Sequence, residues 1–233
     1  MTALHPIKEI SINTQESGSE STGLLLATSC PVIPIITIDD ASQADALADA
    51  LLAGGIGCAE ITLRTDAGIR AIERLTGRAD ILVGAGTVVS AEDVDRAADA
   101  GASFVVSPGL GLDVLERSQE RGLAVIPGIA TASELQTAVL HGLRFVKLFP
   151  AAAIGGLALI DAFGGPFPQV RFMPSGGVSM DNLGGYLAHP AVFAAGCSWV
   201  ATRSDIANGR FDHISAQASA ASRIAGRLAA IPG

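Results

Sequence analysis

Residues 81–107 read ILVGAGTVVSAEDVDRAADAGASFVVS, and this stretch decides the fold. It begins and ends with short apolar runs, Ile81–Gly84 and Phe104–Ser107, which are typical of strands buried on both faces. Between them, Ala91–Ala100 is Ala-rich and has the period of a helix. A buried strand, a helix and a second buried strand predict a βαβ unit with parallel strands.

The same alternation of apolar runs and helical segments continues along the chain. The other predicted strands are Val32–Ile38, Cys58–Leu63, Ala124–Pro127, Phe145–Phe149, Arg171–Pro174 and Val192–Cys197. The other predicted helices are Ala41–Ala53, Asp66–Leu75, Leu112–Arg121, Ser133–His141, 156–163, Met180–Ala188 and 212–228. Eight strand–helix units in one chain predict an α/β protein, a (β/α)8 TIM barrel rather than a doubly wound sheet.

Three turn signals follow predicted strands. They are Pro108-Gly109, Pro127-Gly128 and the run Pro174–Gly177. Each of them can turn the chain at one end of the barrel. Active sites of such barrels lie at the carboxyl ends of the strands, so we expect these turns to surround the site.

The composition fits one barrel domain. The chain has 233 residues, of which 49% are hydrophobic and 16% charged, so it is too apolar for a disordered chain. TIM barrels typically need about 250 residues, and no linker divides the chain after residue 20. Residues 1–20 are rich in Ser, Thr, Glu, Gln and Asn. We therefore expect a mobile N-terminal tail over 1–20 and a single barrel domain over 21–233.

Charge and cysteine usage argue against several kinds of partner. The chain has 15 Lys+Arg, 23 Asp+Glu and no basic cluster, which argues against nucleic acid and an anionic membrane surface. The three cysteines form no CxxC pair and the four histidines are scattered, so we expect neither a metal nor a cofactor. Residues 21–38 carry no charge, but prolines and hydroxyl residues interrupt them, and no targeting segment is visible. We expect a cytoplasmic protein.

The stretch Cys58–Arg64 reads CAEITLR and is unusual for a buried strand. Side chains alternate along a strand, so Glu60, Thr62 and Arg64 share the face opposite to the apolar residues. The apolar face suits the helix layer, and the polar face should therefore line the barrel interior. Charged residues are rarely buried without a partner, which favours a functional site. The alternative is a structural ion pair inside the barrel, or a strand end in solvent.

The sixth predicted strand supplies a partner for Glu60. It reads RFVKLFP over Arg144–Pro150 and places Lys147 between hydrophobic residues. Lys8 is the only other lysine of the chain, and all other basic residues are arginine. Burial favours the neutral amine, which is a nucleophile, whereas a guanidinium does not lose its proton in proteins. A salt bridge to Glu60 could have used arginine, so the choice of lysine favours a Schiff-base nucleophile.

Small residues follow the last two predicted strands. Ser175-Gly176-Gly177 follows the seventh strand, and Gly196-Cys197-Ser198 follows the eighth. Barrels often bind phosphate where the loops after these two strands meet a short helix. The two turns together predict a phosphate site, and the alternative for each is an ordinary tight turn. The segment Gly84–Thr87 (GAGT) after the third strand is similar, but it lacks GxGxxG spacing and implies no dinucleotide.

Together, these motifs resemble those of a known family. From about residue 23 onward the chain is similar to the bacterial 2-keto-3-deoxy-6-phosphogluconate (KDPG) and 4-hydroxy-2-oxoglutarate (KHG) aldolases. The segments that carry the resemblance, in this order and spacing, are Pro31–Ile36 (PVIPII), Glu60–Thr65 (EITLRT), Gly84–Val88 (GAGTV), Ser107–Gly109 (SPG), Pro127–Ile129 (PGI), Lys147–Ala151 (KLFPA), Pro174–Gly177 (PSGG) and Ser198-Trp199.

The resemblance implies a class I aldolase that cleaves KDPG into pyruvate and glyceraldehyde 3-phosphate, with KHG as a second candidate substrate. It places the Schiff-base lysine on Lys147 and the general acid/base on Glu60. The carboxylate-binding residues fall on Arg64 and Thr87. The other expected substrate-binding residues, which hold phosphate or line the pocket, are Pro108, Phe149, Ser175, Gly176, Gly177 and Ser198. The family is typically a homotrimer, and it uses no metal.

Three positions depart from the family pattern. Ala152 stands where an acidic residue is common, Ser175 where threonine is common and Cys197 where glycine is common. None of these changes alters the lysine or the glutamate.

Two other functions are compatible with parts of the pattern. A phosphate-binding TIM-barrel epimerase or isomerase would share the loops after the last two strands but would not need Lys147. A sugar-phosphate binding protein without catalytic activity would keep these loops and Arg64 but would have no use for an internal lysine–glutamate pair.

Overall fold

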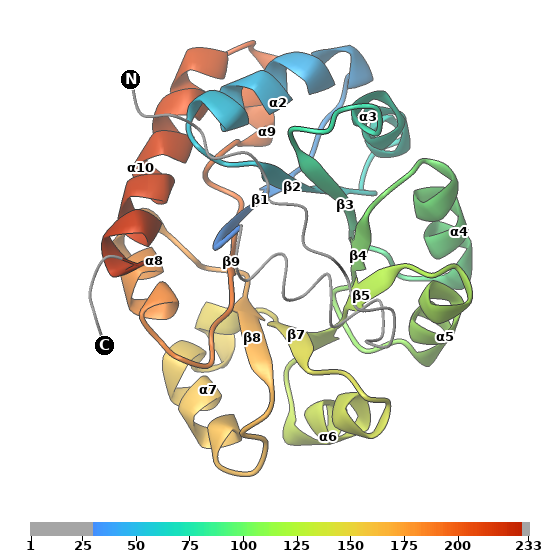
Figure 1. Ribbon diagram of the computed structural model, residues 1–233, viewed down its shortest axis with the longest axis vertical. Coiled ribbons are helices and arrows are strands. Elements are labelled where there is room, and N and C mark those ends of the chain that lie inside the picture. The colour runs from blue at the N-terminus through green and yellow to red at the C-terminus, as the bar shows by residue number, and fades with distance from the viewer. Residues whose placement is uncertain (1–29, 230–233) are drawn as a thin grey trace.

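The computed structural model describes residues 30–229, and the predicted tail over 1–20 lies outside the described residues. The described strands run parallel and curve around a centre, with helices on the outer side (Figure 1). The strands are β1 Val32–Ile36, β2 Cys58–Thr62, β3 Leu82–Gly86, β4 Phe104–Val106, β5 Ala124–Ile126, β6 Gly128–Ile129, β7 Phe145–Leu148, β8 Arg171–Pro174 and β9 Ala195–Cys197. The α-helices are α2 Ala44–Ala53, α3 Ala67–Leu75, α4 Ala91–Asp99, α5 Leu112–Glu120, α6 Ala132–Leu140, α7 Gly156–Gly164, α8 Met180–Leu187, α9 Arg203–Ala207 and α10 Phe211–Ala229. Short 3₁₀ helices cover Ala41–Gln43 and Ala151–Ile154.

Hydrogen bonding divides the strands into two sheets. Six strands follow the order β5-β4-β3-β2-β1-β9, and three follow the order β6-β7-β8. Two isolated bridges connect the second sheet to the first at β9. Phe172 of β8 pairs with Val192, which precedes β9, and Ser175, which follows β8, pairs with Gly196 of β9. On the other side, the Lys147 N–H of β7 donates to the Pro127 carbonyl, between β5 and β6, at 2.8 Å. The architecture is therefore α/β, with a curled sheet of parallel strands.

Local sequence explains where the outer helices begin. The Ser90 side chain accepts a hydrogen bond from the Asp93 N–H at the start of α4. At the start of α6, Thr131 and Glu134 form a capping box. Such caps satisfy N–H groups that have no partner in the first turn of a helix. Val94, on the sheet side of α4, is fully buried, so the cap and the apolar stripe together fix this helix on the sheet.

One predicted turn and one predicted strand end are wrong. Strand β3 extends two residues beyond the predicted end at Gly84, so Gly86 also lies within the strand. Pro127 separates β5 from β6, and Gly128 begins a further strand directly after it. Proline has no N–H to donate, so it interrupts the ladder, and the predicted fifth strand is followed by a second short one.

The last part of the sheet also differs from the prediction. The expected strand Val192–Cys197 is reduced to β9, and Val192 forms only an isolated bridge. Helix α9 was not predicted, because five residues are too few to show a helical period.

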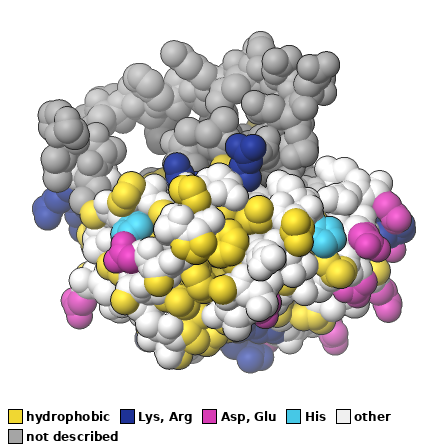
Figure 2. All heavy atoms as spheres, turned by 90° about the horizontal axis from the view of Figure 1, so that it is seen from below, with side chains coloured by type: hydrophobic (Ala, Val, Ile, Leu, Met, Phe, Trp, Pro, Cys, Tyr) yellow, Lys and Arg dark blue, Asp and Glu magenta, His cyan; other side chains and the backbone are white. Residues whose placement is uncertain are grey.

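Hydrophobic side chains gather on one outer face of the molecule. Figure 2 shows them at the end of the molecule where α6 and α7 lie. Leu140, the last residue of α6, is 77% exposed. Single exposed apolar residues are ordinary, whereas a contiguous group is typical of an interaction surface.

Candidate active site

The structure brings the two predicted catalytic residues together. Glu60 lies on β2 and Lys147 on β7, in different sheets and 87 residues apart in sequence. The Lys147 Nζ lies 3.3 Å from Glu60 Oε1, and the two side chains are 7% and 1% exposed. The curvature of the sheet therefore places a buried lysine and a buried glutamate in direct contact.

The polar atoms around this pair are only partly matched. Glu60 Oε1 accepts from Lys147, whereas Glu60 Oε2 is buried and has no hydrogen-bond partner among the described residues. Ser175 Oγ, at the carboxyl end of β8, is also buried without a hydrogen-bond partner among the described residues. Leaving a buried polar group unpaired costs about 1–3 kcal/mol. Such atoms favour a site that binds a polar ligand over a salt bridge with a purely structural role.

Phe149 lies beside the lysine. Its ring centre is 5.5 Å from Lys147 Nζ, a distance at which the face of an aromatic ring attracts a cation. Phe149 directly follows β7 and is the second residue after Lys147. Side chains two residues apart in an extended chain point the same way, so Phe149 lies on the same side as Lys147. The ring also packs close to Gly176, where an added Cβ would lie 3.2 Å from it.

Arg64 and Thr87 lie next to each other beyond the ends of neighbouring strands. Arg64 is exposed, and its Nε donates to Thr87 Oγ1 at 3.1 Å. Thr87 directly follows β3 and has a φ of 60°. Positive φ is rare for a β-branched residue and persists only where the surroundings hold it. The guanidinium and the hydroxyl thus form a paired donor group at the carboxyl ends of β2 and β3.

The loops after β7 and β8 are bonded to each other. The Ala151 N–H donates to the Ser175 carbonyl at 2.7 Å, and the Ala152 N–H donates to the Gly176 carbonyl at 3.0 Å. Gly176 and Gly177 have φ of 86° and 81°, a conformation that favours glycine. An added Cβ on Gly177 would lie 2.3 Å from Ala152 Cβ, so these two loops are packed as closely as backbone allows.

The residues of β9 and the residue after it lie beside the loop that follows β8. Ser198 is exposed and directly follows β9, while Gly196 bridges to Ser175. Successive side chains of a strand point to opposite faces, so Cys197 points away from the face that Gly196 shares with Ser175. Cys197 is fully buried, and burial raises the pKa of its thiol to about 12. The cysteine at this position is therefore a neutral packing residue.

Pro108 lies at the carboxyl end of β4 and borders a cavity of about 260 Å³. Its carbonyl oxygen would be 2.2 Å from a Cβ on Gly128, so the chain after β4 presses against β6. Glu60 and Lys147 lie within β2 and β7. Every other predicted site residue lies at or just beyond the carboxyl end of a strand.

Gly84 and Gly86 also border the site, although their motif suggested a turn. In the β2–β3 register Gly84 lies opposite Glu60 and Gly86 opposite Thr62. Paired residues of parallel strands face the same side, so the alternation that places Glu60 on the inner face also places both glycines there. The sequence alone would have placed these glycines beside Glu60 if the predicted second and third strands had been aligned residue by residue.

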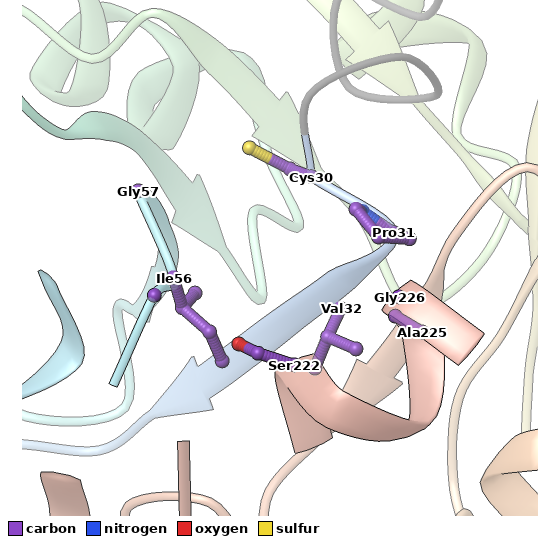
Figure 3. A pocket seen from close by; sticks show the side chains of 9 residues that line it. Cys30, Pro31, Val32, Ile56, Gly57, Ser222, Ala225 and Gly226 are labelled. Carbon is purple, nitrogen blue, oxygen red and sulfur yellow. The ribbon is translucent and has the colours of Figure 1, made fainter. Parts of the chain in front are cut away.

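A second cavity lies far from these residues, near the start of β1. It has a volume of about 230 Å³ and lies between β1, the segment before β2 and α10 (Figure 3). Its lining residues are small or apolar: Cys30, Pro31, Val32, Gly55, Ile56, Gly57, Ser222, Ala225 and Gly226. This lining holds no charged side chain and no histidine, so it supplies no general base beside the Cys30 thiol or the Ser222 hydroxyl.

Over residues 30–229, no group of three or more His, Cys, Asp or Glu side chains is placed to hold a metal ion. In the same range, no helix has both the length and the hydropathy of a membrane-spanning segment.

Comparisons with known proteins agree with the motifs. The family model described as KDPG and KHG aldolase matches residues 26–217. The 2-dehydro-3-deoxy-phosphogluconate aldolase of Treponema pallidum is 42% identical over 196 residues, which cover 84% of this chain and 93% of that protein. The enzyme of the same name from Pseudomonas aeruginosa is 45% identical over 179 residues, covering 76% and 81% of the two chains.

A solved structure extends the similarity to three dimensions. It is the KDPG aldolase of Legionella pneumophila with pyruvate captured as a covalent carbinolamine intermediate. It superposes with a TM-score of 0.82 at 38% sequence identity, covering 89% of this chain and 98% of that chain. The match to the family model spans most of the sequence and includes the buried Lys147–Glu60 pair. The chain belongs to the KDPG and KHG aldolase family.

Proposed function

We propose that this chain is a class I aldolase that reversibly cleaves KDPG into pyruvate and glyceraldehyde 3-phosphate, with KHG as a second substrate. The observation that carries the proposal is the 3.3 Å contact between a buried lysine and a buried glutamate on the inner face of the sheet. An epimerase, an isomerase or a sugar-phosphate binding protein would leave this pair unused, and the family assignment does not favour them.

In this mechanism Lys147 is the nucleophile. Its neutral amine attacks the C2 ketone to give a carbinolamine. The carbinolamine hydroxyl takes up a proton from solvent and leaves as water, and a protonated imine remains between Nζ and C2. The C3–C4 bond then breaks, and its electron pair moves into the iminium to give an enamine of pyruvate. The C4 hydroxyl loses its proton at the same time and becomes the aldehyde of glyceraldehyde 3-phosphate.

Glu60 is the proton carrier of these steps. Its carboxylate takes the proton of the C4 hydroxyl and later returns a proton to C3, which becomes the methyl group of pyruvate. Hydrolysis of the imine then frees pyruvate and restores the amine of Lys147. The 3.3 Å contact of Oε1 with Nζ supports this role, because the imine and its neighbouring carbon atoms would form beside the carboxylate.

The remaining site residues hold the two ends of the substrate. Arg64 and Thr87 bind the C1 carboxylate, for which a guanidinium fork is suited. The phosphate is bound by Ser175, Gly176, Gly177 and Ser198, which contribute backbone N–H groups and hydroxyls. Pro108 and Phe149 line the pocket between them.

We further infer that the two sheets form one closed (β/α)8 barrel and that 21–233 is a single domain. The bridges Phe172↔Val192 and Ser175↔Gly196 support closure on one side, and the bond from Lys147 N to Pro127 O supports it on the other. Hydrogen exchange tests this inference, because the strands of a closed barrel have no free edge. The amides of the strands at the ends of the two sheets, β5, β6, β8 and β9, should therefore be protected from exchange.

The hydrophobic face over α6 and α7 supports a homo-oligomer, and we infer a homotrimer located in the cytoplasm (Figure 2). Light scattering coupled to size-exclusion chromatography measures the mass directly. A monomer of 23.6 kDa at micromolar concentration would contradict the trimer.

Borohydride trapping tests the proposed activity. Incubation with pyruvate and borohydride should reduce the imine and leave a pyruvate-derived adduct on the peptide that contains Lys147. A folded protein that forms no adduct, and that releases no pyruvate from KDPG, would overturn the proposal.

A further inference from the structure

Two glycines on β3 face the same side as Glu60. Gly84 pairs with Glu60 and Gly86 with Thr62, and Ala85 between them points to the opposite face. Glycine weakens the interior of a strand, and its presence there often marks a close approach by another group. The two positions lie one pleat apart, so they can be compared directly.

The backbone conformation does not require glycine at either position. The glycines with positive φ in the described part of the chain include Gly176 and Gly177 but neither Gly84 nor Gly86. An alanine could therefore adopt the local backbone, and the reason for glycine must lie in the space beside it.

Different groups fill the space beside each glycine. A Cβ on Gly84 would lie 2.3 Å from the Phe104 ring, so an apolar side chain occupies that position. A Cβ on Gly86 would lie 2.2 Å from Glu60 Oε1, 2.5 Å from its Cγ and 2.7 Å from its Cδ. Carbon atoms in contact are normally about 3.5–4.0 Å apart, so an alanine at position 86 and the present position of Glu60 exclude each other.

The direction of the Glu60 side chain gives this space a function. Glu60 is paired with Gly84 but lies against Gly86, so its side chain leans along the strands toward their carboxyl ends. The oxygen that lies over Gly86 is Oε1, the same atom that accepts from Lys147 Nζ. Any group that displaces this oxygen also changes its distance from the lysine.

We propose that Gly86 is a positioning residue for the reaction: its missing side chain provides the space in which the Glu60 carboxylate leans toward Lys147. The inference rests on the proposed function only for its catalytic consequence. Gly84 serves packing, since it gives room to the Phe104 ring, and provides a matched control on the same strand and face.

The test compares Gly86→Ala and Gly84→Ala, each alone and in a Glu60→Ala background. Alanine at position 60 ends at Cβ, so neither the Cγ nor the carboxylate that lies over Gly86 remains. Gly86→Ala should lower kcat for KDPG cleavage by about 10²-fold, the size expected for a misplaced catalytic group, with little change in KM. Deuterium exchange into the pyruvate methyl group should fall with kcat, whereas the borohydride adduct on Lys147 should persist. Gly84→Ala should lower the melting temperature but not this ratio of exchange to trapping.

The double variants distinguish positioning from general damage. In the Glu60→Ala background, Gly86→Ala should cost little of the residual activity and cause a smaller drop in melting temperature than in the wild type. Equal losses in both backgrounds, or wild-type kcat in a folded Gly86→Ala protein, would overturn the inference. If Gly86→Ala alone does not fold, a folded Glu60→Ala/Gly86→Ala protein supports the inference and an unfolded one overturns it.

The melting temperatures also separate the two proposals. If wild-type protein shows neither cleavage nor an adduct, the proposed aldolase function fails. The steric relation between positions 60 and 86 is then still decided by the melting temperatures of the four variants.

Discussion

The charged residues between α4 and α5 differ from the charged pair on the inner face in exposure, residue type and number of partners. On the outside, Asp95 contacts Arg117 at 2.8 Å and Arg121 at 2.5 Å, and Arg121 also contacts Asp99 at 2.5 Å. Each of these side chains is more than a quarter exposed. On the inner face, one lysine and one glutamate share a single contact of 3.3 Å and are almost fully buried.

The difference separates charges that serve structure from the pair that we propose serves chemistry. The outer network uses arginine, and hydrogen bonds from Arg117 and Arg121 hold the pKa of the Asp95 carboxyl below its ordinary value of 3.8. The inner pair uses lysine and leaves Glu60 Oε2 without a partner among the described residues. Saturated arginine contacts hold a surface in place, whereas a lysine that can lose its proton beside a half-paired carboxylate can react.

The substitution expected to have the largest effect is Lys147→Arg. It replaces the lysine of the inner pair with arginine, the residue that forms the outer ion pairs. The guanidinium keeps the charge and most of the volume but cannot form an imine. We expect KDPG cleavage to fall to background and the borohydride adduct to disappear, while the circular dichroism spectrum is retained. Appreciable turnover in a folded Lys147→Arg protein would remove the Schiff-base mechanism.

Glu60→Gln is the next largest change. Glutamine is nearly isosteric and still forms hydrogen bonds, but it does not accept a proton in the reaction. General acid–base catalysis typically contributes about 10²–10⁴-fold, so cleavage and proton exchange at the pyruvate methyl group should both fall by that order. Some trapped adduct should persist, because the amine of Lys147 that forms the imine is still present. Exchange at the wild-type rate would mean that Glu60 is not the base.

Ser198→Ala should have an intermediate effect that depends on the substrate. A hydrogen bond to a charged group contributes about 1.5–3 kcal/mol, which is roughly a factor of 10 to 10² in binding. The loss should fall mainly on KDPG and spare KHG, which carries no phosphate. Arg64→Ala is the matched control, since it should weaken both substrates alike. Equal losses for the two substrates in Ser198→Ala would mean that the phosphate lies elsewhere.

The smallest effect should come from the outer network. Asp95→Asn removes a carboxylate whose pKa is lowered in the folded state, mainly by hydrogen bonds from Arg117. Such a group adds stability above its unfolded pKa, near 3.8, and loses it as the pH falls through the lower folded value. Wild type should therefore melt slightly above Asp95→Asn at neutral pH, and the difference should vanish on acidification. Wild-type catalysis should remain, and a fall in kcat would contradict the separation of the two regions.

The sequence predicts more of the site than of the turns. Glu60 and Lys147 stand out from the order of residues alone, because a charge within a short apolar strand has few explanations. Pro127-Gly128 fails as a turn because the same dipeptide can also interrupt a strand. Gly86 is misassigned because the sequence does not distinguish a glycine required by a neighbouring side chain from a glycine required by a turn. Only strand pairing shows which group, Phe104 or Glu60, fills the missing volume.

The scarcity of lysine also affects the chemical durability of the protein. Lys147 is the only lysine in residues 30–229, and it is buried. Reactive carbonyl compounds, including the aldehyde and the keto acid of the proposed reaction, form adducts with free amines but not readily with guanidinium groups. Over the described residues such compounds therefore meet one side-chain amine, the one assigned to catalysis. The surface of this region carries its positive charge on arginine, so its charge pattern resists slow glycation by the enzyme's own product.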